Sequence, residues 1–72
     1  MWIRNEDLLI NLNKIEFITL NYDEKITANF FPDENTEPHI ISFKKEEEEK
    51  ARGLLIDIEH ALLENEKFLL ID

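Results

Sequence analysis

Short runs of apolar residues separated by polar clusters fill the first half of the chain and predict strands. Trp2 and Ile3 are followed by Asn, Glu and Asp at positions 5–7 and then by an apolar run at 8–10. Because Asn and Asp between apolar β-forming residues favour a turn, we expect a short hairpin here. Residues 11–14 predict a second turn.

The next run, residues 15–22, is strongly apolar, but its alternation slips. Ile15 and Phe17 fall on one side of an extended chain, whereas Ile18, Leu20 and Tyr22 fall on the other. A β-bulge near residues 17 and 18, or burial on both faces, would explain the slip. We expect a strand in either case.

A hairpin turn at residues 21–25 leads into the clearest strand of the sequence. Ile26, Ala28 and Phe30 alternate there with polar residues, which is the period of a half-buried strand. Phe31 lies off this face, so we expect it to be exposed unless a second layer or a partner subunit covers it.

Residues 32–38 include two prolines, which cannot donate to a strand ladder, and several acids. They predict an exposed acidic loop. Residues 39–43 then predict a returning strand with Ile41 and Phe43 on one face.

The period becomes helical at about residue 45 and remains so to residue 64. One apolar stripe recurs at i, i+3, i+4 and i+7 and consists of Ala51, Leu54, Leu55, Ile58, Ala61 and Leu62. The stripe predicts an amphipathic helix lying across the sheet. Asn65 is expected to end the helix in a left-handed conformation, and residues 67–71 predict a last strand.

Four glutamates at positions 46–49 lie in the first turn of this helix, where negative charge is favourable. Glu46 with Lys50 and Glu48 with Arg52 are predicted ion pairs in the better of the two orientations. The acidic run therefore has a structural explanation.

The fold class predicted from these elements is α+β in a single domain, residues 1–72. A small antiparallel β-sheet of four to six short strands is covered by one C-terminal amphipathic helix, and a short final strand follows. A chain of 72 residues without cysteine buries little core, so further stability must come from tight packing, a metal or self-association. We expect a homodimer.

Composition excludes many enzyme classes. With one glycine and no cysteine, the chain cannot form a P-loop, a Gly-rich dinucleotide site, a zinc finger, a disulfide framework or a cysteine nucleophile. The sole serine, Ser42, lacks a Gly-flanked nucleophile elbow and is expected to cap the helix at the strand-to-helix junction. We expect no enzymatic activity and no cofactor.

Charge points to the kind of partner. Seventeen acids against eight basic residues give a net charge of −9, the wrong sign for direct binding of nucleic acid. Residues 23–49 hold nine acids and three lysines, a net of −6. A partner steered by this field would present a basic surface, although solubility alone is the other explanation.

The expected compartment is the cytoplasm. The sequence opens without a cationic stretch followed by an apolar segment, and no apolar run approaches the roughly 18 residues of a spanning helix. We therefore expect no membrane partner.

Three segments carry a resemblance to known proteins. They are Trp2-Ile3-Arg4, the step Leu9-Ile10-Asn11-Leu12 before Ile15, and the helix stripe leading to Phe68-Leu69-Leu70-Ile71-Asp72. In these segments the chain resembles a group of small, mostly uncharacterised bacterial and phage proteins. The resemblance implies the α+β fold and a bacterial or phage setting, and it carries over no site residue.

Two polar groupings suggest metal sites but are explained more simply. Asp57, His60 and Glu64 would share one side of the helix at a spacing that a metal ion can use, yet a closed site needs further ligands, so we interpret them as a solvated polar face. The acids of the 32–38 loop lack the glycine and the ordered oxygen spacing of a calcium loop. We expect no metal.

A second ridge on the predicted helix lies away from the core stripe and consists of Gly53, Ile56, His60 and Leu63. Glycine inside a helix costs about 1 kcal/mol relative to alanine, and close approach of another backbone would compensate for that cost. Two exposed aliphatic side chains are also ordinary on any surface. We expect the ridge to mediate self-association.

The expected function is that of a small, acidic, non-enzymatic interaction protein that occupies a partner's surface. Its sharpest form is a phage- or prophage-type inhibitor of a bacterial defence or nucleic-acid-handling protein; the alternative is an oligomeric protein that sequesters a small molecule. The candidate partner-binding residues are Gly53, Ile56, His60, Leu63, Phe31, Asp33, Glu34 and Glu37.

Overall fold

Six short strands and one helix make up the fold, which a computed structural model describes over residues 1–71. The strands are β1 (Trp2–Asn5), β2 (Leu8–Asn11), β3 (Phe17–Tyr22), β4 (Ile26–Phe31), β5 (His39–Phe43) and β6 (Phe68–Ile71), and the helix is α1 (Glu48–Leu63). Single 3-10 turns precede β3 and α1, at Leu12–Lys14 and Lys45–Glu47. The α+β class, the single C-terminal helix and the final strand are confirmed.

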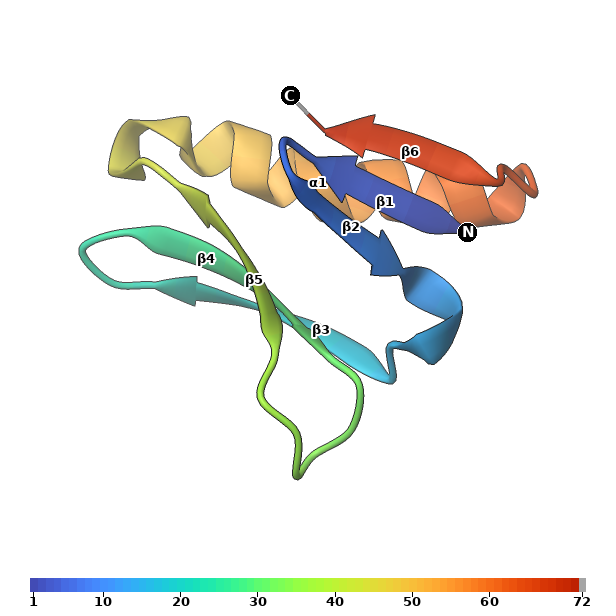
Figure 1. Cartoon of the computed structure of the whole chain (residues 1–72). Helices are drawn as coiled ribbons and strands as arrows, with labels where there is room; N and C mark the ends of the chain where they lie inside the picture. Colours follow the sequence, from blue (N-terminus) through green and yellow to red (C-terminus); the bar gives the residue numbers. More distant parts are fainter. Residues whose placement is uncertain (72) are drawn as a thin grey trace.

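The strands divide between two sheets of three, with strand orders β2-β1-β6 and β3-β4-β5 (Figure 1). The second is an antiparallel meander, as expected. The first is mixed, because β1 pairs antiparallel with β2 and parallel with β6. A single antiparallel sheet was predicted because alternation shows which residues share a face but not which distant strand lies alongside.

Of the two explanations for the slipped alternation in β3, a bulge or burial on both faces, the bulge is absent from the described structure. The β3 and β4 registers run without interruption from Phe17 opposite Phe31 to Tyr22 opposite Ile26. Ile15 lies before the strand and packs against the core from there. Within β3 the slip remains at Phe17, whose ring stacks on Phe31 on the outward side, whereas Ile18 and Leu20 pack against the core.

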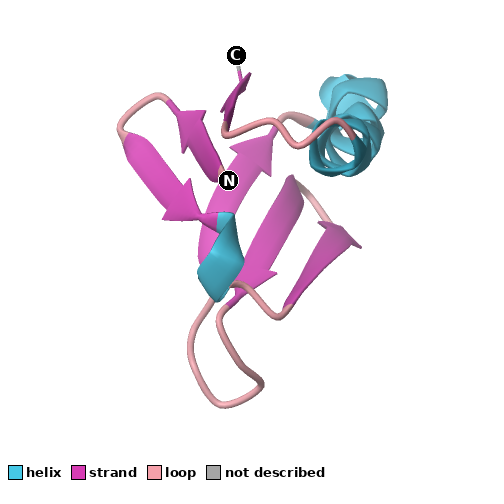
Figure 2. Ribbon diagram, turned by 90° about the vertical axis from the view of Figure 1, so that its right-hand side faces the viewer, coloured by secondary structure: helices cyan, strands magenta, loops and turns pink. Residues whose placement is uncertain are grey.

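The core lies between the inward sides of the two sheets and α1, which packs beside β4, β5 and β6 (Figure 2). Its buried apolar residues are Ile3, Ile10, Ile26, Ala28, Phe30, Ile41, Phe43, Ala51, Leu54, Ile58 and Ala61. The alternating face predicted for β4 and the inward pair of β5 are thus confirmed. Burial of this set is the main favourable contribution to folding.

Two residues of the predicted helix stripe do not reach the closed core. Leu55 is half-buried, and Leu62 is exposed. Leu62 lines an open apolar hollow of about 360 Å³ together with Leu12, Ile15 and Ile58, so the strands beneath this end of α1 do not close over it. The prediction that the whole stripe is core was therefore wrong at Leu62.

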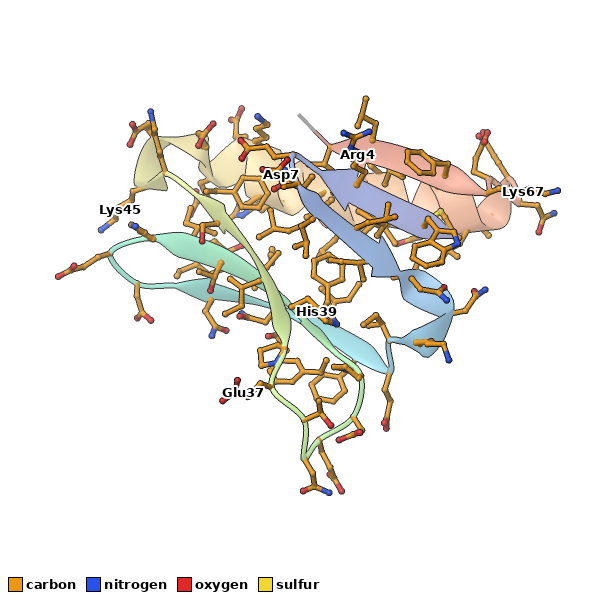
Figure 3. All side chains as sticks on the ribbon, in the orientation of Figure 1. Arg4, Asp7, Glu37, His39, Lys45 and Lys67 are labelled. Atoms are coloured by element: carbon orange, nitrogen blue, oxygen red, sulfur yellow. The ribbon has the colours of Figure 1, made fainter. Side chains whose placement is uncertain are left out.

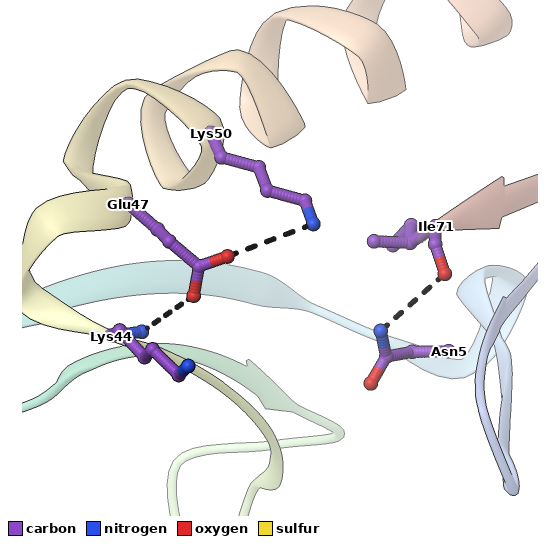
Figure 4. A network of polar contacts seen from close by, with 5 residues as sticks. All are labelled: Asn5, Lys44, Glu47, Lys50 and Ile71. Carbon is purple, nitrogen blue, oxygen red and sulfur yellow. Dashed lines mark hydrogen bonds and ion pairs between the residues drawn. The ribbon is translucent and has the colours of Figure 1, made fainter.

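The start of α1 differs from the predicted arrangement. Ser42 lies inside β5 and caps no helix. Instead, the Lys44 amide donates to the carboxylate of Glu47 (2.9 Å), and Glu47 also pairs with Lys50 at 3.8 Å (Figure 4). Lys50 pairs with the glutamate three residues before it, not with Glu46, because residues 45–47 form a 3-10 turn, which has three residues per turn.

The other predicted ion pair and the helix end are confirmed. Glu48 and Arg52 approach to 3.7 Å. Asn65 is left-handed (φ 57°), and the amides of Asn65 and Glu66 donate to the carbonyls of Leu62 and Ala61. This pair of hydrogen bonds is the Schellman motif, which turns the chain sharply toward β6.

No helix within residues 1–71 has the length and apolar character needed to cross a membrane.

Candidate functional site

Three of the four candidate residues on the helix ridge are exposed, and Gly53 is half-buried. Ile56 is 54% exposed and Leu63 is 74% exposed, and His60 is exposed as well. A Cβ at Gly53 would meet nothing within 4 Å, so no backbone segment elsewhere in residues 1–71 approaches this glycine. The chain itself therefore offers no compensation for glycine in the helix, and the role of the ridge in self-association stays a prediction.

Phe31 is half-buried, because another aromatic ring of the chain covers part of it. It lies at the end of β4 on the outward side, where its ring stacks on that of Phe17 with a centroid distance of 4.6 Å and an interplanar angle of 15°. The neighbouring strand supplies this cover, since Phe17 is the register partner of Phe31. Aromatic pairs across strands stabilise a sheet, so Phe31 has a structural role within the chain.

The acidic loop is built around Asp33. Its carboxylate accepts hydrogen bonds from the Asn35 amide (2.8 Å) and the Thr36 hydroxyl (2.8 and 2.9 Å). The Thr36 hydroxyl, followed by the Asn35 amide, lowers the pKa of Asp33 below its usual value. Glu34 and Glu37 are exposed in the same loop, so Asp33 shapes the loop while Glu34 and Glu37 extend into solvent.

The eight predicted partner-binding residues form two separate groups. Phe31 and the loop acids lie at the end of the β3-β4-β5 sheet, whereas the ridge lies on α1, on the opposite side of the molecule in Figure 1. One flat partner surface cannot cover both groups.

Asp57, His60 and Glu64 do not form a metal site. Within residues 1–71, no group of three or more His, Asp or Glu side chains is arranged to hold a metal ion. Asp57 and His60 on α1 and Glu64 directly after it are all exposed. Their arrangement agrees with a solvated polar face.

A surface that the sequence analysis did not identify lies on the outward side of the β2-β1-β6 sheet. The register places Trp2 opposite Phe68, and Arg4 opposite both Leu9 and Leu70. Because side chains alternate across a strand, these five residues share the side that faces away from the core. Figure 3 shows Arg4 at this sheet, far from Glu37 in the acidic loop.

Four large apolar side chains are exposed on this side. The exposed fractions are 43% for Trp2, 53% for Leu9, 51% for Phe68 and 62% for Leu70. These four residues are called the apolar sheet face below. Trp2 and Phe68 are register partners, whereas Arg4 lies between Leu9 and Leu70. Exposed apolar residues grouped on one side of a sheet mark binding sites more often than scattered single residues do.

The apolar sheet face is also poor in charge. The other outward residues of the three strands are Arg4 and Asn11, and none of the six within residues 1–71 is acidic. The Arg4 Nε donates to the Glu6 carbonyl at 3.2 Å, which draws this side chain toward the β1-β2 turn. A hollow of about 350 Å³ beside it is lined by Arg4, Leu8, Leu9 and Phe68 together with two acids of the β1-β2 turn, Glu6 and Asp7.

A second, polar hollow gathers basic residues. It measures about 490 Å³ and is lined by Asn5, Glu6, Lys25, Ser42, Phe43, Lys44, Glu47 and Lys50. Three of the eight basic residues of the chain are thus brought to one place from the β3-β4 turn, the end of β5 and the start of α1. Figure 4 shows Lys44 and Lys50 on either side of Glu47.

Most carboxylates have no basic partner. Within residues 1–71, the ion pairs are Lys50 with Glu47 and Arg52 with Glu48, although the chain has seventeen acids. Arg52 also lies 6.0 Å from the centroid of the Tyr22 ring, and the Tyr22 hydroxyl, followed by Glu48, raises the pKa of Arg52. The remaining negative charge faces solvent and is available to a partner.

Comparisons of the chain with family models, with curated proteins and with solved structures gave no match.

Sequence reasoning missed the apolar sheet face for one reason. The chain contains the signal, since residues 68–71 are apolar at every position, which is typical of strands covered on both faces. The outward neighbours of β6, however, depend on its parallel pairing with β1, and no local pattern reveals that pairing. The polar hollow was missed because its lysines are far apart in the sequence.

Proposed function

We propose that this protein is a non-enzymatic interaction protein that occupies a basic surface of another protein. The observation that supports this function best is the large excess of exposed carboxylates without a basic partner. Such a field raises the rate of encounter with a basic patch and favours it over acidic ones. In its sharpest form, the partner is a bacterial defence or nucleic-acid-handling protein whose phosphate-binding groove the carboxylates block, as in a phage- or prophage-type inhibitor.

The acidic loop offers the cleanest test of this proposal. Glu34 and Glu37 are exposed there, whereas Asp33 holds the loop together, so Glu34→Gln with Glu37→Gln removes charge and keeps the loop's hydrogen bonds. Glu59→Gln on α1 with Glu64→Gln at its C-terminal end removes the same charge elsewhere and serves as the matched control, called the α1 control.

Each variant, immobilised, is used to capture proteins from bacterial lysate at low and high salt. We expect wild type and the α1 control to retain a common partner at low salt and to lose it at high salt, since screening weakens contacts between exposed charges. The loop variant should retain less of that partner. Capture that is insensitive to salt, or equal capture by both variants, would contradict recognition of a basic surface through the loop.

The polar hollow favours a second candidate function, sequestration of a small anionic molecule. Its volume of about 490 Å³ lies in the range of ligand sites, and Lys25, Lys44 and Lys50 line it. Lys50 already pairs with Glu47, which leaves Lys25 and Lys44 as the residues to test. The protein is purified, denatured and analysed for released small molecules by mass spectrometry. An anionic species present with wild type and absent with Lys25→Gln/Lys44→Gln would favour sequestration, and its absence from wild type would count against it.

A further inference from the structure

We propose that the apolar sheet face binds a second copy of this chain, and that two β2-β1-β6 sheets pack face to face across a two-fold axis. Trp2, Leu9, Phe68 and Leu70 of each copy would then meet the same four residues of the other. Sheets stacked in this way lie about 10 Å apart, with side chains from both filling the space between. This dimer is independent of the basic partner proposed above.

The sequences of β2 and β6 are typical of strands that are covered on both faces. Residues 68–71 are apolar without interruption, and residues 8–10 are apolar at all three positions. In each run, one set of side chains faces the core and the other faces solvent in the single chain. Continuous apolar strands are typical of sheets that are covered on both sides, so the outward set needs a cover that the chain does not supply.

The exposed apolar area of the sheet face is large enough for a dimer interface. The four side chains expose about half their surface, and large side chains of roughly 200 Å² each then leave on the order of 400 Å² of apolar area. Interfaces are roughly 57% apolar, so this area is the apolar part of an interface burying about 700 Å² on each copy. The resulting total of about 1,400 Å² is that of a standard stable interface.

The low charge of the apolar sheet face favours a second copy of this chain as its partner. Two copies with a net charge of −9 each repel one another over most of their surfaces. The four residues of the apolar sheet face are uncharged, and the only charged side chain among the six outward residues of the three strands within residues 1–71 is Arg4. Glu6 and Asp7 border this side in the β1-β2 turn and can offset the Arg4 charge of the second copy. Like-charged copies therefore approach here at lower electrostatic cost than through the acidic surfaces. A strongly basic partner would gain nothing from this face.

The helix ridge is the rival surface within the chain. Ile56 and Leu63 are exposed, but acids lie close by. Asp57 and Glu64 follow them directly in sequence, and Glu59 lies within one helical turn of both. Pairing two ridges would bring acids of both copies together, which opposes association. The ridge also offers two large apolar side chains where the sheet face offers four.

Two double variants separate the surfaces. Leu9→Glu with Leu70→Lys places charges on either side of Arg4 in the sheet face, and Ile56→Glu with Leu63→Lys makes the same chemical change on the ridge. Particle mass is measured by light scattering on size-exclusion chromatography, and far-ultraviolet circular dichroism checks the fold.

We expect wild type and the ridge variant to have twice the chain mass of 8.6 kDa. The sheet-face variant should have the single mass, with its dissociation constant raised about tenfold or more. A wild type that is monomeric at concentrations on the order of 100 µM overturns the proposal. A ridge variant that is monomeric beside a dimeric sheet-face variant also overturns it and assigns association to the ridge.

Trp2 fluorescence reports on the proposed interface without any substitution. It tests dimerisation through the apolar sheet face even if the sheet-face variant does not fold. It is the only tryptophan of the chain and lies within the proposed interface. Its emission should shift to longer wavelength on dilution and become more sensitive to quenching by acrylamide. Emission and quenching independent of concentration, together with a constant single mass, would show that no second copy covers Trp2.

Discussion

At the scale of single residues, Ile58 and Leu62 lie one turn apart on α1 in very different surroundings. Ile58 is buried among the core residues, whereas Leu62 is 52% exposed at the edge of an open hollow. We expect Ile58→Ala to lower the free energy of unfolding by about 2 to 5 kcal/mol through lost burial and a residual cavity. Leu62→Ala should cost well under half as much. Chemical denaturation measures both values, and equal costs would mean that α1 is rotated relative to the described packing.

Asp33 offers a second prediction at this scale, through pH. Its lowered pKa means that the loop contributes stability above the pKa of the unfolded chain and loses it as pH falls through the folded value. Thr36→Val removes the hydroxyl donor and should raise the pKa of Asp33, whereas Thr36→Ser keeps the donor and should leave it low. Titration of the Asp33 carboxyl by NMR measures the shift. The same pKa in both variants would show that the hydroxyl does not hold the carboxylate.

At the scale of elements, Glu47 is the one glutamate of the run 46–49 that holds the chain at the start of α1 through contacts with both Lys44 and Lys50. Glu47 accepts the Lys44 amide and pairs with Lys50, whereas Glu46 makes neither contact. We expect Glu47→Ala to destabilise the protein by about 0.5 to 2 kcal/mol, the usual effect of a lost helix cap. Glu46→Ala, the matched control with the same charge change, should be nearly neutral. Urea unfolding of the pair provides the comparison, and equal losses would mean that only net charge matters.

The sequence predicts elements well and their partners poorly. The β1-β2 hairpin, the alternation of β4 and the left-handed Asn65 follow from neighbouring residues, so local pattern is sufficient for them. The parallel pairing of β1 with β6 joins residues 2–5 to 68–71, and no local rule identifies that neighbour. The exposed helix ridge was predictable from period alone. The apolar sheet face was not, because it exists only once β1, β2 and β6 are side by side.

At the scale of the whole molecule, charge and apolar surface are separated. Carboxylates in the 32–38 loop and at the start of α1 face solvent. The outward strand residues of the β2-β1-β6 sheet within residues 1–71 include none, and Glu6 and Asp7 lie at its border in the β1-β2 turn. A dimer through that sheet leaves both acidic groups of each copy free and doubles the negative field presented to a basic partner. We therefore expect the proposed self-association to strengthen with salt and the proposed partner binding to weaken.

Sedimentation equilibrium of the wild-type protein at low and high salt tests this account most directly. Screening weakens the repulsion between two copies of net charge −9 and leaves the apolar contact intact. We therefore predict a reversible dimer of the 8.6 kDa chain whose dissociation constant falls as salt is raised. A single-chain mass at every concentration and salt, or a dimer that salt dissociates, would contradict the account.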